Sequence, residues 1–252
     1  MKNKKRFHQL ASLVLGVYIM SVVSGCNEHH VKSGSGRVLD PIEELGIEGK
    51  YEVKFLPLNT SLAGISNAKA KIHIVADHIS VELKMQDSPP LTLHSQFIYT
   101  SSVCPSDIHD ANKDGFIDPQ EAAKVLGPIL IPLDSDLSSQ MDGITQFPFS
   151  DSLGKYHYAQ EGLLSHLIAD LQSPDMNPKD ELGKLNHGQQ LKLDGKVMVI
   201  QGVPDDLYVP GSISSIGTNS DRATLPIACG KISRVLLEES ETSESEEDIW
   251  QK

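Results

Sequence analysis

The feature of this sequence that most constrains its fold is a series of short segments in which apolar and polar residues alternate with a period of two. Residues 68–75 and 79–85 are the clearest. In the first, lysines and His73 fall between alanines and isoleucines; in the second, Glu82 and Lys84 fall between valine, leucine and methionine. This alternation indicates antiparallel strands that bury one face. It predicts an all-β domain, with His73 on the solvated face.

Other segments complete the predicted domain, which we place at residues 48–236. Further strands are expected at residues 51–56, 91–99, 191–201 and 223–236. Residues 127–133 are extended and contain two prolines, which suits the edge of a sheet. Residues 161–171 predict an amphipathic helix, because their leucines and isoleucine recur at helical spacing, with His166 off that face.

A twelve-residue segment at positions 110–121 matches the calcium loop of EF-hand proteins. Oxygen-bearing side chains stand at alternate positions, and Gly115 occupies position six, where the chain must turn sharply. The predicted ligands are Asp110, Asn112, Asp114, the backbone carbonyl of Phe116, Asp118 through water, and Glu121 with both carboxylate oxygens. The alternative, a polar surface turn, does not explain why every position of the pattern is filled. We therefore predict a Ca²⁺ site.

The flanks of this calcium loop predict one helix after it and none before it. Asp118 is a good N-cap, Pro119 suits the first helical position, and Gly127 with Pro128 ends the helix. Residues 103–109 lack the apolar periodicity of an entering helix. No second copy of the loop is found, so a paired sensor motion is not expected. The pattern favours a structural calcium clamp.

The first residues predict export. Four basic residues at positions 1–6 precede an apolar run, residues 10–23, which is short for a transmembrane helix. The following Val-Ser-Gly-Cys resembles a bacterial lipobox, in which Cys26 is lipidated after removal of residues 1–25. Ordinary secretion with an incidental Cys26 is the alternative. Asn27 after the cysteine resembles an outer-membrane sorting signal, so we expect a lipid anchor in the outer membrane of the cell envelope.

The net charge of the mature chain limits the kinds of partner that it can bind. The whole sequence carries −12; the leader removes four of 22 basic residues and no acid, which leaves 18 basic against 34 acidic residues, or −16. This balance argues against nucleic acid and anionic lipid as partners. Residues 26–47 read as a polar, flexible tether and residues 237–252 as a disordered acidic tail. Nothing in the sequence names a protein or small-molecule partner.

Two cysteines remain if Cys26 carries lipid. Cys104 and Cys229 would then meet an oxidising compartment, where an even pair implies a disulfide. The bridge would tie the base of the calcium loop to the last predicted strand.

Two segments resemble a known family. Residues 195–206 (Gly-Lys-Val-Met-Val-Ile-Gln-Gly-Val-Pro-Asp-Asp) and 227–232 (Ile-Ala-Cys-Gly-Lys-Ile) resemble the carboxyl-terminal part of Cu/Zn superoxide dismutases. Residues 93–99 (Leu-His-Ser-Gln-Phe-Ile-Tyr) resemble the family's Leu-His-Gly-Phe-His-x-His segment, with Cys104 where the disulfide begins. The resemblance implies a Greek-key antiparallel β-sandwich, here with an inserted calcium loop and one or two short helices.

The departures from the family concern its metal ligands. Phe97, Tyr99 and Gln201 stand where the resemblance places copper-binding histidines, whereas His94 matches a histidine that is structural in the family. Copper redox chemistry needs several imidazoles on one ion. No histidine-rich zinc segment is found, and a displaced copper site would have to use residues such as His109 and His157.

Two functions follow from these observations. The first is an envelope-anchored calcium-binding lipoprotein, a non-catalytic β-sandwich stabilised by Ca²⁺ and a disulfide, with a binding or structural role. The second is an exported copper/zinc dismutase-like metalloenzyme with displaced ligands. The motifs of serine hydrolases, zinc proteases and phosphate-binding loops are absent from the sequence.

Overall fold

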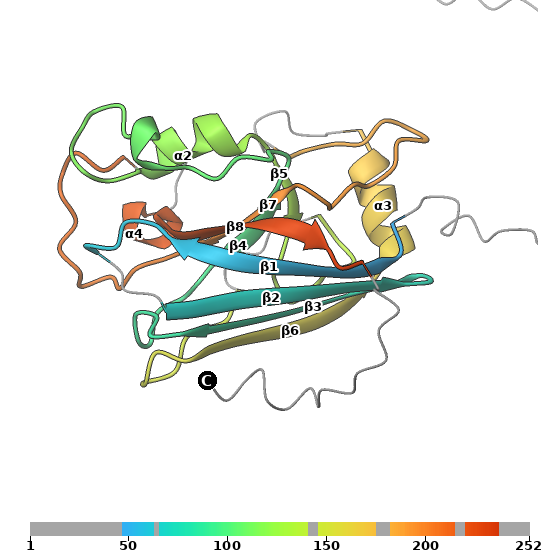
Figure 1. Cartoon of the computed structure of the whole chain (residues 1–252), viewed down its shortest axis with the longest axis horizontal. Coiled ribbons are helices and arrows are strands. Elements are labelled where there is room, and N and C mark those ends of the chain that lie inside the picture. Colours follow the sequence, from blue (N-terminus) through green and yellow to red (C-terminus); the bar gives the residue numbers. More distant parts are fainter. Residues whose placement is uncertain (1–46, 63–65, 141–145, 175–181, 215–219, 237–252) are drawn as a thin grey trace, which may run out of the picture. The chain divides into compact units, whose positions relative to one another are not determined.

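The computed structural model describes residues 47–62, 66–140, 146–174, 182–214 and 220–236 (Figure 1). All of them fall within one compact unit, residues 39–252. The predicted leader, Cys26, nearly all of the tether and the acidic tail lie outside the described residues. Among the described residues, no helix is long and apolar enough to cross a membrane.

Short strands dominate the described part of the chain. The strands are β1 (Gly49–Pro57), β2 (Ser66–Val75), β3 (His78–Gln86), β4 (Gln96–Tyr99), β5 (Ile129–Pro132), β6 (Tyr156–Leu163), β7 (Val197–Gln201) and β8 (Pro226–Arg234). The helical segments are the 3₁₀ turn η1 (Asp107–His109) and the helices α2 (Pro119–Leu126), α3 (Leu164–Gln172) and α4 (Asp221–Thr224).

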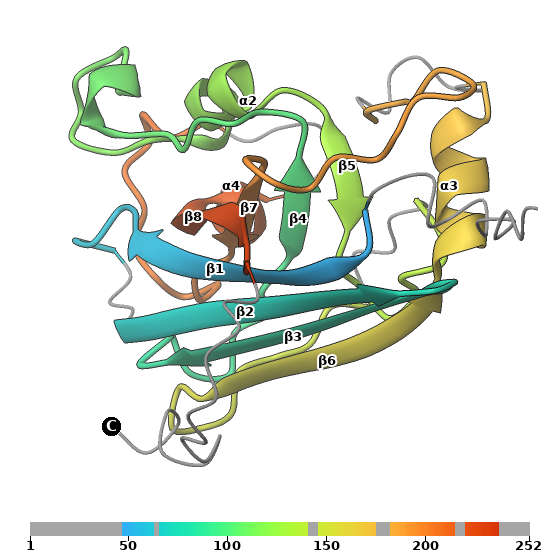
Figure 2. The same cartoon turned by 45° about the vertical axis from the view of Figure 1, so that its right-hand side comes forward.

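These strands form one sheet in the order β5-β4-β7-β8-β1-β2-β3-β6, and every neighbouring pair is antiparallel. After the β4–β5 pair the chain crosses to add β6 beside β3, then returns to place β7 beside β4. Such a return is a Greek-key connection. The sheet curls so that β2, β3 and β6 face β4 and β5 (Figures 1 and 2). The predicted all-β Greek-key sandwich is confirmed.

The sheet has two apolar layers, because β4, β7 and part of β8 are buried on both faces. Ile98, Met198 and Ile200 point into the inner core, the large cluster between the two halves of the sheet. The residues that alternate with them point the other way, into a second, outer cluster. The outer cluster consists of Leu58, Phe97, Tyr99, Ile117, Ala122, Leu126, Phe147, Val197, Val199 and Cys229. This double burial explains why β4 and β7 read as continuous apolar runs.

The cover over the outer cluster is the long connection between β4 and β5. It contains residues 110–121, the predicted calcium loop, and α2, and it contributes Ile117, Ala122 and Leu126 to the cluster. Figures 1 and 2 both show α2 on the side of β4 and β7 away from β2, β3 and β6. The calcium loop is therefore part of the layer that seals one face of the sheet.

Several predicted boundaries are wrong. Residues 161–163 belong to β6, a strand that was not predicted, and α3 begins only at Leu164. β6 shows alternating burial, with Tyr156 and Tyr158 inside, and it pairs with β3 along its whole length. Gly162 lies against the backbone of Leu137, where a Cβ atom would come within 2.7 Å of the Leu137 carbonyl carbon, so glycine suits this position of β6.

Three other strands are shorter than predicted. β4 begins at Gln96 rather than at residue 91, β7 begins at Val197 rather than at residue 191, and β8 begins after α4. The excluded residues include three buried leucines that lie outside any strand, Leu191, Leu193 and Leu225, while Ala223 and Thr224 belong to α4. An apolar pattern alone does not separate a strand from such a buried connection. The remaining strands match their predicted segments to within three residues at each end.

Candidate functional site

The disulfide fixes the base of the connection that carries the calcium loop. Cys104 and Cys229 are bonded, with a Cα–Cα distance of 5.8 Å and a sequence separation of 125 residues. Cys229 lies in β8, between β7 and β1, and belongs to the outer cluster. The prediction that these two cysteines pair is confirmed.

The first half of the calcium loop is closed by the carboxylate of Asp110. Its oxygens accept hydrogen bonds from the backbone N–H of Asp114 at 3.2 Å and of Gly115 at 2.8 Å. Gly115 has φ +88° and Lys113 has φ +59°, so the chain reverses through the left-handed region. Glycine at position six is what this reversal requires, as the sequence predicts.

The second half of the loop is joined to α2 by a reciprocal cap. The backbone N–H of Glu121 donates to Asp118 Oδ1 at 2.8 Å, and the N–H of Asp118 donates to Glu121 Oε2 at 3.0 Å. Glu121 Oε1 also accepts from the N–H of Ala111 at 2.7 Å and of Asn112 at 3.2 Å. Both carboxylates are buried. Glu121 therefore links the beginning of the loop to its end, and the predicted exit helix from Pro119 is confirmed.

Asn59, in the β1–β2 connection, holds the middle of the loop. Its Nδ2 donates to the carbonyl of Ile117 at 2.9 Å, and the N–H of Ile117 donates to its Oδ1 at 2.8 Å. The same Nδ2 donates to the carbonyl of Pro226, the first residue of β8, at 3.0 Å. Both backbone polar groups of the buried Ile117 are thus satisfied by one side chain. Sequence reasoning missed Asn59, because no local motif marks a residue 58 positions away.

The connection between β7 and β8 touches the loop from the other side. The N–H of Ser214 donates to Asp118 Oδ2 at 3.2 Å, and the Ser212 hydroxyl hydrogen-bonds to Asp114. Burial alone would raise the pKa of Asp114. Hydrogen bonds from Ser212, Phe116 and Asn112 outweigh burial and lower it. The Asp114 carboxylate is therefore charged at neutral pH.

The donor set of the loop matches the chemistry of a hard cation, because it offers oxygens and no nitrogen or sulfur. A cavity of about 380 Å³ adjoins it, lined by Asp107, Asp110, Gly115 and residues 57–61 among others. Within the residues that the structure describes, no three His, Cys, Asp or Glu side chains converge closely enough to hold a metal ion. The loop carboxylates instead point to backbone N–H groups, as described above.

The three residues at the expected copper positions do come together. Phe97 and Tyr99 alternate along β4 with ring centroids 6.0 Å apart, and the Gln201 amide donates to the Tyr99 hydroxyl at 3.1 Å. Ser95 donates to Gln201 Oε1 at 3.1 Å, and Phe147 lies against Phe97 at 5.3 Å. A phenyl ring, a phenol and an amide do not form a copper site. These residues pack and hydrogen-bond with one another, so they do not fit the family's metal.

His94 is buried beside this group but faces the inner core. Its ring meets Tyr156 edge to face at 5.4 Å, and its Nδ1 lies 3.2 Å from the carbonyl of Gln201. Its Nε2 finds no hydrogen-bond partner among the residues that the structure describes. Burial lowers the pKa of His94 to about 4, although the carbonyls of Gln201, Pro89 and Gly202 act in the opposite direction. The ring is therefore neutral at pH 7.

The other histidines considered as ligands lie in separate places. His109 lies beside the calcium loop, where its Nδ1 is 3.0 Å from the N–H of Ser106. His157 lies on β6, 3.2 Å from Glu82. The turn η1, which contains His109, contacts α2, and Figures 1 and 2 both show α2 at the top of the fold and β6 at the bottom. The structure does not bring the two rings together.

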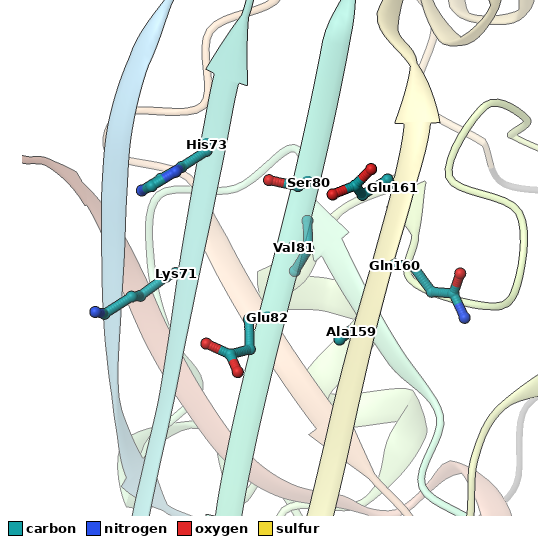
Figure 3. Close-up of a pocket in the computed structure, with 8 residues that line it drawn as sticks. All are labelled: Lys71, His73, Ser80, Val81, Glu82, Ala159, Gln160 and Glu161. Carbon is teal, nitrogen blue, oxygen red and sulfur yellow. The ribbon is translucent and has the colours of Figure 1, made fainter. Parts of the chain in front are cut away.

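A shallow hollow of about 540 Å³ lies on the outer face of β2, β3 and β6. Figure 3 shows His73, Ser80 and Glu161 in one line across these strands, with Lys71 and Glu82 beside them. His73 is half-buried rather than fully solvated. Among the described residues, no hydrogen bond joins His73, Ser80 and Glu161.

No protein-family model and no curated protein matches the sequence. The solved structures that are similar to it include superoxide dismutases. A mutant of superoxide dismutase 5 from Candida albicans is 11% identical, with a TM-score of 0.37, over 79% of this chain and 99% of that chain. A double mutant of a SOD-like protein from Bacillus subtilis is 13% identical, with a TM-score of 0.37, over 71% and 95%. The Cu/Zn superoxide dismutase from Brucella abortus is 15% identical, with a TM-score of 0.34, over 72% and 98%.

Proposed function

We propose that this chain is an envelope-anchored lipoprotein that binds Ca²⁺ in residues 110–121 and uses the ion to hold the outer layer on a non-catalytic β-sandwich. The observation that carries the proposal is the complete oxygen-donor pattern from Asp110 to Glu121, on a loop that turns at Gly115 and ends in α2. The role is structural, because the loop covers the outer cluster.

The cation would act on a concentration of negative charge. Asp110, Asp114, Asp118 and Glu121 place four carboxylates within twelve residues. Bound Ca²⁺ would offset their repulsion and draw their oxygens inward, at the expense of some hydrogen bonds to backbone N–H groups. The loop is tied to β1, β7 and β8 through Asn59, the β7–β8 connection and the disulfide. Ordering the loop would therefore also hold these connections in place.

Thermal unfolding of the full chain in EGTA and in millimolar Ca²⁺ tests the proposal. Lone extracellular sites bind with a Kd on the order of 10⁻⁴–10⁻³ M, so about 10 mM Ca²⁺ should add about 1–3 kcal/mol to the free energy of unfolding. For a domain of this size the melting temperature should rise by about 2–12 °C. Mg²⁺ should have much less effect, since it requires a smaller, octahedral site.

Glu121→Gln is the informative variant. It keeps an oxygen that can accept the loop's N–H bonds but removes the charge and the bidentate carboxylate, so most of the Ca²⁺ shift should disappear. Glu161→Gln, which removes one exposed carboxylate from β6, is the matched control and should keep the full shift. A wild-type melting curve that ignores Ca²⁺, together with no ion retained on dialysis, would refute the calcium site.

Anchoring is tested separately at Cys26. We expect Cys26→Ser to release the protein from the membrane fraction or to leave an uncleaved precursor. Unchanged membrane partition with unchanged processed mass would show that no lipid is attached at this residue. This outcome would leave the calcium site unaffected, because Cys26 lies outside the sandwich domain.

The dismutase alternative is tested by copper and zinc reconstitution of the full chain. Superoxide decay should not exceed that of free copper at the same concentration, because Phe97, Tyr99 and Gln201 offer no imidazole. Faster decay that survives removal of free copper would establish the alternative and a ligand set other than the family's.

A further inference from the structure

A line of basic side chains crosses the outer face of five neighbouring strands. The register places Lys231 of β8 opposite Lys54 of β1, and it continues strand by strand to β6. We call this set the lysine row; it consists of Lys231, Lys54, Lys69, Lys84 and His157. With strands about 4.8 Å apart, the row is about 19 Å long. It stands on a chain whose formal charge is −12.

The positive charges of the lysine row repel one another and destabilise the sheet unless negative groups offset them. Like charges directly opposite each other on neighbouring strands are destabilising. Glu82, one step along the same face, pairs with Lys84 at 2.6 Å and with His157 at 3.2 Å. Within the described residues, Lys54, Lys69 and Lys231 form no ion pair, although Glu52 stands on the same face. The uncompensated charge therefore lies at the β8 end of the row.

A hollow of about 560 Å³ lies at this same end. Three cationic residues line it, Lys54, Lys231 and Arg234, together with one acid, Glu52, and with Leu56 and the disulfide. Leu56 is 71% exposed. The hollow thus offers cationic walls and an apolar patch to a segment that carries acids and a few apolar residues.

The chain itself continues from this place. β8 ends at Arg234, and the N–H of Val235 donates to the carbonyl of Lys50 at 2.8 Å. Lys231 lies three residues before Arg234, about 10 Å away along β8. Residues 238–248 hold seven acidic residues and no basic one, and Ile249 and Trp250 follow. A flexible chain of sixteen residues would have a root-mean-square length of about 20–24 Å, which is enough to cover the row.

We propose that the acidic segment 237–252 folds back and docks on the lysine row. Its carboxylates would neutralise Lys231, Lys54 and Lys69, and its apolar end would reach the hollow beside Leu56. Because the segment is tethered, its effective concentration at the row is on the order of millimolar, which favours it over free anions. Docking also offsets the like-charge repulsion across the strands, and it blocks the binding of other polyanions to the lysine row.

Trp250 is the only tryptophan of the chain, so its fluorescence reports on this segment alone. The steady-state anisotropy of Trp250 in the full chain should be high at low ionic strength and should fall as NaCl is raised. The screening length shortens from about 30 Å at 0.01 M to about 3 Å at 1 M salt, which is enough to release an exposed charge contact. Access of the neutral quencher acrylamide to Trp250 should rise in parallel.

Paired lysine variants locate the contact. Lys54→Gln with Lys231→Gln should remove most of the salt-sensitive anisotropy. Lys124→Gln with Lys192→Gln makes the same change in net charge away from the row and should retain it. Circular dichroism melting checks that each variant is folded, and fewer like charges on β1 and β8 should not destabilise the sheet.

Three outcomes would overturn the proposal. The first is an anisotropy that is low and independent of salt in the wild-type chain. The second is an equal loss in the two paired variants, which would show a net-charge effect without a docking site. The third is an anisotropy that rises with protein concentration, which would place the segment on another copy of the chain or on a separate partner.

Discussion

The inner core and the outer cluster of this domain are held together in different ways. The inner core is a continuous set of aliphatic and aromatic side chains from facing strands, which alternate with exposed residues along β1, β2, β3 and β6. The outer cluster is smaller and has a loop for its cover. That cover is fastened at discrete points: the disulfide, Asn59 and the Asp118–Glu121 cap. The comparison suggests that packing defines the sandwich, whereas a few polar and covalent links define the layer on which we place the calcium site.

The largest effect should come from opening the disulfide. Cys104→Ser with Cys229→Ser removes a cross-link over 125 residues, which the chain-entropy treatment values at about 4–5 kcal/mol. Urea unfolding, followed by circular dichroism, should show a corresponding loss in the free energy of unfolding.

The same variant sharpens the comparison between the two layers. If the link serves mainly the outer layer, hydrogen exchange should accelerate most at α2 and the calcium loop, and least in β2 and β3. Equal acceleration in both layers would show that the disulfide supports the whole sandwich and that the two layers unfold as one.

Acid should act on the inner core through His94. Its pKa is about 4 in the folded chain against 6.5 for the free side chain, so the unfolded chain binds the extra proton first. The stabilisation by the neutral ring is complete above pH 6.5 and is lost as the pH falls toward 4. The difference in pKa corresponds to about 3 kcal/mol.

The free energy of unfolding, measured from pH 7 to pH 4, checks this expectation. Glutamine at position 94 cannot titrate in this range. The difference in the free energy of unfolding between wild type and His94→Gln should therefore change by about 3 kcal/mol from pH 7 to pH 4, in the direction that favours the variant at low pH. Parallel pH profiles would mean that the ring does not remain neutral in the folded chain.

The smallest of these effects should follow the loss of Asn59. Asn59→Ala leaves the buried N–H and carbonyl of Ile117 without partners, which costs about 1–3 kcal/mol. If the outer layer and the calcium site are coupled, the affinity for Ca²⁺ should fall as well, as titration calorimetry would show. The control is Thr60→Ala at an exposed neighbouring position, which should change neither quantity.

The sequence by itself determined the features that depend on neighbours along the chain. The alternation in residues 68–75 and 79–85 specified two strands, and Asp118 with Pro119 specified where α2 begins. Gly115 specified the turn within residues 110–121, the predicted calcium loop. Each of these follows from local sterics or local hydrogen bonding, which a short stretch of sequence contains completely.

Only the tertiary structure decided how distant segments share one surface. The hydrogen bonds of Asn59 and Ser214 to the calcium loop span 58 and 96 residues, and the lysine row arises from the register of five strands. β6 was missed because its partner β3 lies some 70 residues earlier, and its tyrosines indicate burial only once that pairing is known. A register sets which side chains stand opposite one another, and it depends on the packing of the whole sheet.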